Sequence, residues 1–349
     1  MASASLRTRL LLVTLLVWLT VSCTSTDQIP RYTFRGETMG TSFSVTVAGQ
    51  PLSGEVISQL RAAIDSQLAN LDAMMSTYES RSEVSRFNAS TSTDWFQVSH
   101  DTAMVFQWAR EISEATRGAF DVTVGSLVDA WGFGPAGPPQ TLPSDSDVAR
   151  LLTAVGFIQI EVDEAIPAIR KTSADVRVDL SAVAKGYAVD RVADFLAAEG
   201  HRSYLIEIGG EVRTRGHRTA GQPWRVGIER PTDGPASLHG VIELTDAALA
   251  TSGDYRNYIE VDGVRRSHTI DPRIGRPVTH TLASVSVIDT LCVRADALAT
   301  ALEVLGPDEA YELATEQGWA ALLIVRDNDG GYRERLTPAF SARSAYEAH

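Results

Sequence analysis

The chain has 349 residues, of which 44% are hydrophobic, and its formal net charge is −13. This length and apolar content suit one large or two smaller globular domains with a buried core, and they exclude a chain that is disordered throughout. The negative charge argues against a general nucleic-acid-binding protein, which would usually be basic, so we expect no nucleic acid among the partners.

The N-terminus has the pattern of an export signal. Two arginines precede the apolar run LLLVTLLVWLTVSC, residues 10–23, which is short of the about 20 residues that span a bilayer. The small residue Ser22 just before Cys23 is typical of a bacterial lipoprotein signal. We therefore expect a signal peptide over residues 1–22 and a periplasmic protein anchored to the inner membrane through a lipidated Cys23. Plain secretion is the alternative.

The next segments alternate between strand and helix patterns. Residues 23–33 are expected to form a polar tether, and the alternation over 31–49 predicts two strands with a bend at Gly40. Apolar residues spaced by three or four predict helices over 53–78 and 99–121. A Pro/Gly/Ser-rich loop over 134–147, a helix over 146–156 and short strands over 158–171 should follow.

The second half of the chain is richer in strands. Residues 176–200 are expected to run from a strand into a helix with Ser181 as its N-cap. Strands are predicted over 204–216, with a Gly-Gly bend, and over 224–231, 239–253, 255–263, 282–290 and 320–330; helices are predicted over 294–306 and 308–317. Helices and adjacent strands mix without regular βαβ alternation, which favours an α+β fold over a doubly wound sheet.

Two residues of the predicted helix 294–306 are candidate metal ligands. Asp296 and Thr300 are four residues apart, so their oxygens lie on one face of the helix. A carboxylate with a hydroxyl suits a hard cation such as Mg²⁺. An Asp that interacts with the helix dipole and a Thr that bonds back to a carbonyl explain the same spacing, and spacing alone favours this structural explanation.

Three other segments carry polar residues at element ends. Asp179 in VDLSAVAKGY precedes a helix N-terminus, where an anion can bind, and Lys185 could face a phosphate; a capped helix with an exposed lysine is the alternative. In AFDVTVG, Phe120 offers a stacking face and Asp121 an acceptor, unless they are a core and a turn residue. His268 in SHTIDPRIGRPV is a candidate general base on a tight turn, or a solvated loop histidine.

The chain contains only one cysteine besides Cys23. If Cys23 is lipidated, the mature chain cannot form an internal disulfide, and its stability must come from the core. Cys292 stands in an apolar context, where we expect it to be a small buried hydrophobic residue.

Nine ordered blocks together resemble the ApbE family of FAD:protein FMN transferases over about residues 34–325. They are ETMGTSFSV, MMSTYESRSEVSRFN, GAFDVTVG, DLSAVAKGYAVDRV, YLIEIGGEVRTRG, WRVGIERP, ATSGDYRNYIEVDGVRRSHTIDPRIGRPV, ASVSV and ADALATALEVLG. The resemblance implies an ApbE-like α+β fold with a T-fold-like core, in which mixed, largely antiparallel sheets pack with helices. It implies one transferase domain over 34–335 and a C-terminal tail over 336–349.

The resemblance also implies an activity: Mg²⁺-dependent transfer of FMN from FAD to a threonine hydroxyl of an acceptor flavoprotein, with release of AMP. The acceptor would be a subunit of a redox complex or an exported reductase. His268 would be the base that deprotonates the threonine. The flavin site would take Met39, Tyr78, Ala119, Phe120, Asp121, Asp179, Lys185 and Ile270, and the Mg²⁺ site would take the Ala182 carbonyl, Asp296 and Thr300.

Two other functions use the same features. A metal site that binds FAD could hydrolyse it to FMN and AMP if water replaced the threonine. A non-catalytic flavin-binding lipoprotein would store or deliver the cofactor, but binding alone needs neither the His268 base nor the metal ligands. A purely structural envelope lipoprotein would require the nine blocks to be coincidental.

Overall fold

The computed structural model describes residues 29–163, 165–219, 221–232, 234–255, 257–261 and 264–348. The expected signal peptide over 1–22 and the expected lipidated Cys23 lie outside the described residues. Within those residues, no helix combines the length and the apolar character that a membrane span requires.

The centre of the fold is an eight-stranded sheet in which each strand is antiparallel to its neighbours. In spatial order the strands are β1 (Arg31–Thr38), β2 (Thr41–Ala48), β6 (Tyr204–Ile208), β7 (Glu211–Arg215), β10 (Ala248–Gly253), β15 (Leu282–Asp289), β16 (Ala320–Arg326) and β17 (Tyr332–Leu336). With its helices, this antiparallel sheet confirms the predicted α+β class.

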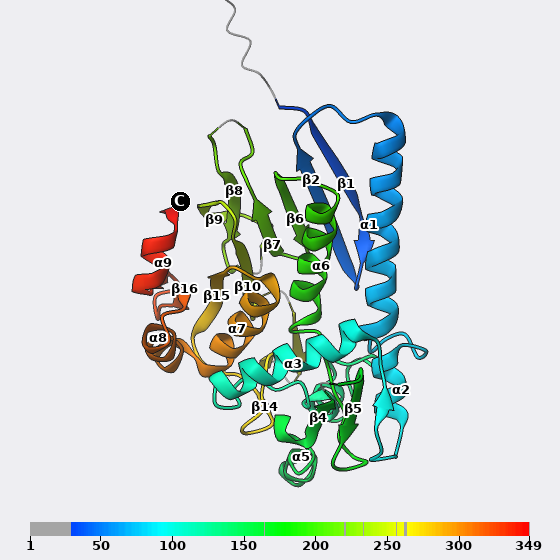
Figure 1. Ribbon diagram of the computed structural model, residues 1–349. Helices are drawn as coiled ribbons and strands as arrows, with labels where there is room; N and C mark the ends of the chain where they lie inside the picture. The colour runs from blue at the N-terminus through cyan, green and yellow to red at the C-terminus, as the bar shows by residue number, and fades with distance from the viewer. Residues whose placement is uncertain are drawn as a thin grey trace, which may run out of the picture.

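Helices cover one face of the sheet and a second sheet covers the other (Figure 1). On the first face lie α1 (Gly54–Met75), α3 (His100–Ala115), α6 (Ala184–Ala198), α7 (Cys292–Leu305) and α8 (Pro307–Glu316). On the second face, β8 (Trp224–Glu229), β9 (Leu238–Leu244), β18 (Ala345–Ala348) and α9 (Pro338–Arg343) close a separate apolar cluster. Cys292 is fully buried, as predicted.

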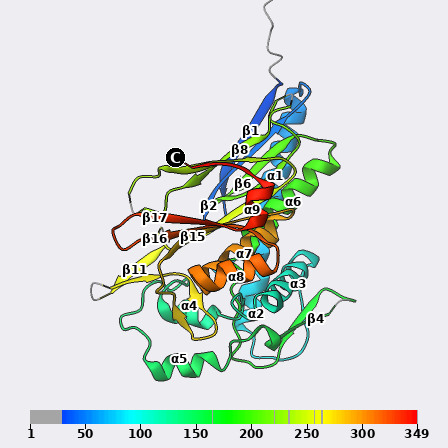
Figure 2. The same ribbon diagram turned by 90° about the vertical axis from the view of Figure 1, so that its left-hand side faces the viewer.

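A smaller layer lies below the main sheet in Figure 2. It contains α2 (Glu83–Ala89), α4 (Gly125–Trp131), α5 (Asp145–Leu152), the short 3-10 helix η1 (Phe157–Gln159) and a three-stranded sheet of β3 (Phe96–Gln97), β5 (Ala168–Lys171) and β4 (Ile160–Asp163). Two hairpins complete the described fold: β11 (Tyr258–Val261) with β12 (Val264–Ser267), and β13 (Ile270–Asp271) with β14 (Arg276–Pro277).

Both ends of the domain differ from the sequence prediction. The first strand begins at Arg31, so the last residues of the expected tether 23–33 belong to the sheet. The segment expected to form a tail, 336–349, continues the fold over its described part, 336–348: α9 inserts the fully buried Phe340 into the core, and β18 pairs with β9. The apolar side chain of Phe340 explains why this segment packs on the domain.

The predicted strand before α6 is also wrong. Between Val176 and Leu180 only an isolated bridge from Arg177 to Val124 forms, because the Asn88 side-chain amide takes both the N–H and the C=O of Val178. Ser181 is not the N-cap: α6 begins at Ala184, preceded by Val183. The predicted loop 134–147 ends early, since α5 starts at Asp145.

Candidate active site

A cavity of about 640 Å³ opens between the main sheet, the helix pair α6–α7 and the smaller layer. Its lining includes ten of the twelve residues selected from the sequence, contributed by segments that are up to 181 positions apart. They are Ala119, Phe120, Asp121, Asp179, Ala182, Lys185, His268, Ile270, Asp296 and Thr300. The fold thus gathers candidate base, metal-ligating and cofactor-binding residues around one space.

The other two selected residues, Met39 and Tyr78, are not among the residues that line this cavity. Met39 occupies the turn between β1 and β2 with a positive φ of 48°, two residues before the lining residue Thr41. Tyr78 is 71% exposed, and its hydroxyl donates to the Phe133 carbonyl at 3.4 Å. Partial burial, and after it the negative charges of Asp179 and Asp129, raise the pKa of Tyr78.

Two of the flavin-site candidates, Phe120 and Asp121, are held tightly. Phe120 is buried in the main core and also borders the cavity. It is therefore a core residue whose position also allows it to contact a bound cofactor. Asp121 accepts hydrogen bonds from the N–H and hydroxyl of Thr123 at 2.8 and 2.6 Å. Burial raises the pKa of Asp121, and these bonds oppose the rise.

Residues of α6, α7 and the turn before α6 bring oxygen atoms to the cavity wall. Gly186 is the third residue of α6, so its N–H has no acceptor within the helix, and it donates instead to the Asp296 carboxylate at 2.9 Å. The Ala182 carbonyl lies just before the helix, and among the described residues no backbone N–H donates to it. One turn after Asp296, the Thr300 hydroxyl is 3.0 Å from the Ser252 hydroxyl of β10. Burial raises the pKa of Asp296, which Lys185 and the Gly186 N–H oppose.

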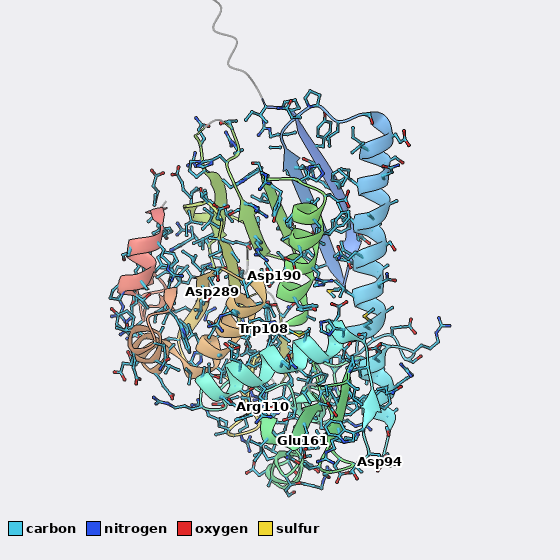
Figure 3. The ribbon with its side chains drawn as sticks, viewed as in Figure 1. Asp94, Trp108, Arg110, Glu161, Asp190 and Asp289 are labelled. Atoms are coloured by element: carbon cyan, nitrogen blue, oxygen red, sulfur yellow. The ribbon has the colours of Figure 1, made fainter. Side chains whose placement is uncertain are left out.

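Gly186 permits this close approach of the two helices. A Cβ atom at this position would lie 2.5 Å from the Cys292 carbonyl oxygen and 2.7 Å from the Asp296 Cβ. Asp190, which Figure 3 labels between the two helices, fixes the pair further. Its carboxylate accepts from the first N–H groups of α7, at Cys292 and Val293, and from the Arg213 guanidinium.

Lys185 forms a buried ion pair at the cavity wall. Its ammonium is 2.5 Å from a carboxylate oxygen of Glu211, which is almost fully buried. Burial opposes the charge on Lys185, but the carboxylates of Glu211 and Asp296 outweigh it and raise its pKa above the ordinary value. Lys185 therefore stays protonated and places a positive charge beside Asp296.

His268 is fixed in an orientation that suits a base. Its backbone N–H donates to the Asn257 carbonyl at 3.1 Å, and its ring Nδ1 lies 2.9 Å from the same oxygen. A carbonyl only accepts, so Nδ1 carries the proton and Nε2 keeps its lone pair. The Phe133 ring meets the imidazole edge-on, with centroids 6.3 Å apart. Burial lowers the pKa of His268, so the ring is neutral at neutral pH.

Strand β8 presents its edge to the cavity. Four consecutive residues, 226–229, line it, although successive side chains of a strand point to opposite faces. The strand edge itself must therefore border the space. In the sheet β18-β9-β8 the strand β8 is terminal, and Gly227 is exposed, so backbone groups are accessible to a ligand there.

The sequence did not single out several residues that complete the site. Asn257 holds the His268 ring, Ser252 contacts Thr300, Glu211 pairs with Lys185, and Gly186 supports Asp296. The glycine of AKGY was a usable signal, because a glycine inside a helix weakens it unless close packing requires one. The other three had no local signal.

A metal site of the acidic-cluster kind is not found. Among the described residues, no group of three or more His, Cys, Asp or Glu side chains is arranged to hold a metal ion. The oxygens of Asp296, Thr300 and Ala182 form a different kind of set, with one carboxylate, one hydroxyl and one carbonyl.

Comparisons with known proteins agree on one family. The model of the ApbE family matches residues 39–323. The FAD:protein FMN transferase of Vibrio cholerae serotype O1 is 42% identical over 307 residues, covering 87% of this chain and 90% of the relative. That of Salmonella typhimurium is 37% identical over 319 residues, covering 91% and 90%.

Solved structures agree as well. The flavin transferase ApbE from Vibrio cholerae has a TM-score of 0.81 at 38% identity, covering 90% of this chain and 99% of that chain. The apo form of the Pseudomonas stutzeri flavinyl transferase ApbE also has a TM-score of 0.81 at 38% identity, with coverage of 90% and 97%. The chain belongs to the ApbE family.

Proposed function

We propose that this chain transfers the FMN part of FAD to a threonine hydroxyl of an acceptor flavoprotein and releases AMP. The observation that carries the proposal is the meeting, in one cavity, of a neutral histidine with a free Nε2 and a cluster of oxygens suited to a cation. The relatives named as FAD:protein FMN transferases supply the reaction class.

The residues at the α6–α7 crossing fit Mg²⁺. Mg²⁺ prefers oxygen ligands and commonly binds through one or two carboxylates, keeping water and substrate phosphates in its other positions. Asp296 provides the carboxylate, and Thr300 the hydroxyl. Among the described residues, no backbone N–H donates to the Ala182 carbonyl, so its oxygen is available to a cation. When bound, the ion would polarise the phosphoryl oxygens of FAD as a Lewis acid.

The transfer step follows from the position of His268. The threonine Oγ attacks the phosphorus of the FMN phosphate, and its proton passes to Nε2 of His268. The new Oγ–P bond forms while the P–O bond to the AMP phosphate breaks, and AMP leaves with the bridging oxygen. A positioned base contributes about 10²–10⁴-fold to such a step. The Nδ1 contact with Asn257 keeps Nε2 available throughout.

Lys185 would balance charge around the diphosphate. Its ammonium lies beside both Glu211 and Asp296, so it offsets carboxylates that would otherwise repel the phosphates of FAD. The Lys185 charge also favours the ionised form of Asp296, which is the form that can bind a cation.

The direct test uses FAD, Mg²⁺ and a threonine-containing acceptor domain. Mass spectrometry is expected to find FMN covalently attached to the acceptor threonine, with one AMP released per flavin attached. AMP release without a labelled acceptor, across several acceptors, would instead identify an FAD hydrolase. Flavin binding without release of AMP would identify a storage protein.

From the N-terminal sequence we also propose export to the periplasmic side and a lipid anchor at Cys23. The support is the apolar run followed by Ser22 and Cys23. Mass spectrometry of the mature N-terminus from the native host is expected to find an acylated Cys23. A soluble, unmodified N-terminus would identify plain secretion.

A further inference from the structure

The β11–β12 hairpin stands apart from the sheets. Its two strands pair only with each other among the described strands, and Figure 2 shows the hairpin extending outward from the body of the fold, away from the helices. A two-stranded hairpin is marginally stable in water on its own. A hairpin that reaches outward beside a reaction cavity is suited to gain a third strand.

The hydrogen-bond pattern identifies which backbone groups of β11 point outward. Opposite residues of an antiparallel pair alternate between bonded and non-bonded pairs. The His268 N–H bonds to the Asn257 carbonyl, so this pair is bonded, and the register makes Ile259 with Arg266 bonded as well. The N–H and C=O groups of Tyr258 and Glu260 therefore point away from β12. Among the described residues, these groups have no backbone hydrogen-bond partner.

The outward edge of β11 begins next to the residue that fixes the catalytic base. Tyr258 follows Asn257, whose carbonyl fixes the His268 ring, and both Asn257 and His268 line the cavity. A strand advances about 3.3 Å per residue, so a chain paired with Tyr258 reaches the level of His268 within one or two further residues. Tyr258 is 39% exposed, and the Arg265 guanidinium lies 3.8 Å from the centre of its ring.

We propose that the outward edge of β11 binds an extended segment of the acceptor protein as a third strand and delivers its threonine to His268. This inference rests on the proposed flavin transfer. The occupant is a polypeptide, because alternating N–H and C=O groups at strand spacing match an extended backbone. Main-chain pairing also tolerates different acceptor sequences, leaving the threonine as the chemically required residue.

The experiment removes one outward N–H group and measures transfer kinetics. Glu260→Pro deletes the N–H of Glu260, and proline is tolerated at an outward edge position. We expect the KM for the acceptor to rise several-fold to about tenfold, the range for one lost hydrogen bond, while kcat at saturating acceptor and FAD binding change little. Glu260→Ala keeps the N–H and should raise the KM less than the proline does.

Arg35→Pro is the matched control. Arg35 lies on β1, which is an edge strand of the eight-stranded main sheet. The Gly49 N–H bonds to the Pro30 carbonyl, so the same alternation turns the Arg35 N–H outward. This variant loses an edge N–H away from His268, and we expect the acceptor KM to stay at the wild-type value.

A second measurement needs no variant. Adding acceptor to the wild-type protein is expected to slow hydrogen exchange at the amides of Tyr258 and Glu260. Equal acceptor KM values for Glu260→Pro and Arg35→Pro, or unprotected amides in the complex, would overturn the docking site while transfer itself persists. If the wild-type protein transfers no flavin to any acceptor, the proposed function fails, and the docking proposal fails with it. If Glu260→Pro does not fold, the exchange measurement decides.

Discussion

Replacing Gly186 by alanine tests whether the packing of α6 on α7 sets the geometry of the site. The added Cβ would lie 2.5 Å from the Cys292 carbonyl oxygen, about 0.9 Å closer than the 3.4 Å at which ordinary contact begins. The second close atom is the Asp296 Cβ, at 2.7 Å. Neither neighbour is the end of a flexible side chain, so the helices must move apart.

The expected loss follows from that displacement. A misplacement of about 1 Å costs roughly 10²-fold in rate, and overpacking a tight core costs about 1–3 kcal/mol of stability. We therefore expect Gly186→Ala to lower kcat for FMN transfer by about 10²-fold, to weaken Mg²⁺ binding and to lower the Tm. Steady-state kinetics, a Mg²⁺ titration and thermal unfolding measure these effects.

Gly54→Ala is the matched control. Gly54 is the first residue of α1, and nothing lies within 4 Å of a Cβ added there. Alanine is favoured over glycine in helices by up to about 1 kcal/mol, so stability should be unchanged or slightly higher and activity unchanged. A Gly186→Ala protein with wild-type kcat, Mg²⁺ affinity and Tm would refute the argument that this glycine positions Asp296.

Three further predictions address the base, the metal ligand and a buried acid. His268→Gln should lower kcat by about 10²–10⁴-fold. Because burial lowers the pKa of His268, the wild-type kcat/KM should rise with pH and reach its plateau at a pH below the ordinary pKa of histidine. A His268→Gln variant whose kcat/KM still rises with pH in this way would exclude His268 as the base. Asp296→Asn should cost about 10²-fold or more in kcat while FAD binding falls less, and full activity in this variant or after chelation would remove the metal role. Glu303 of α7 is fully buried, and neither carboxylate oxygen has a hydrogen-bond partner among the described residues. Burial raises the pKa of Glu303, so the folded state binds the proton more tightly than the unfolded state does. The free energy of unfolding therefore falls as pH rises from the pKa of Glu in the unfolded state toward its higher pKa in the folded state. Glu303→Met should therefore raise the free energy of unfolding by about 1–3 kcal/mol at pH 8 and by less at pH 5, and equal gains at both pH values in denaturant unfolding would contradict a raised pKa.

The sequence predicted most of the helices and strands because their patterns are local. Apolar spacing gave α1 and α3, and alternation gave β1 and β2, with the turn at Gly40 between them. The predictions that failed depend on tertiary contacts. No strand forms at Val178, because its backbone N–H and C=O bond to the side chain of Asn88, which is 90 positions away. The C-terminal segment joined the core through Phe340, because a surface was already available for it to cover.

In the candidate site, too, the features that local spacing sets could be predicted, and those that tertiary contacts set could not. Asp296 and Thr300 could be paired from helical spacing, and the structure confirms that they share one helix. Their environment could not be derived from spacing, because Asn257, Glu211 and Ser252 reach the site from separate turns and strands. Only the family resemblance selected Ala182, because every residue has a backbone carbonyl and the residue type does not indicate which carbonyl binds a metal.

The start of α6 explains how one contact can orient the proposed metal ligand. The N–H of Gly186, in the first turn of the helix, has no acceptor within α6 and donates to Asp296 of α7. The Ala182 carbonyl lies just before this turn. The orientation of Asp296 therefore depends on one contact between two helices that are about a hundred residues apart in the chain, so the proposed metal site can form only after α6 and α7 have packed. The same contact requires a residue without a side chain at position 186. A structural requirement of the helix crossing and a chemical requirement of the cation therefore fall on the same glycine.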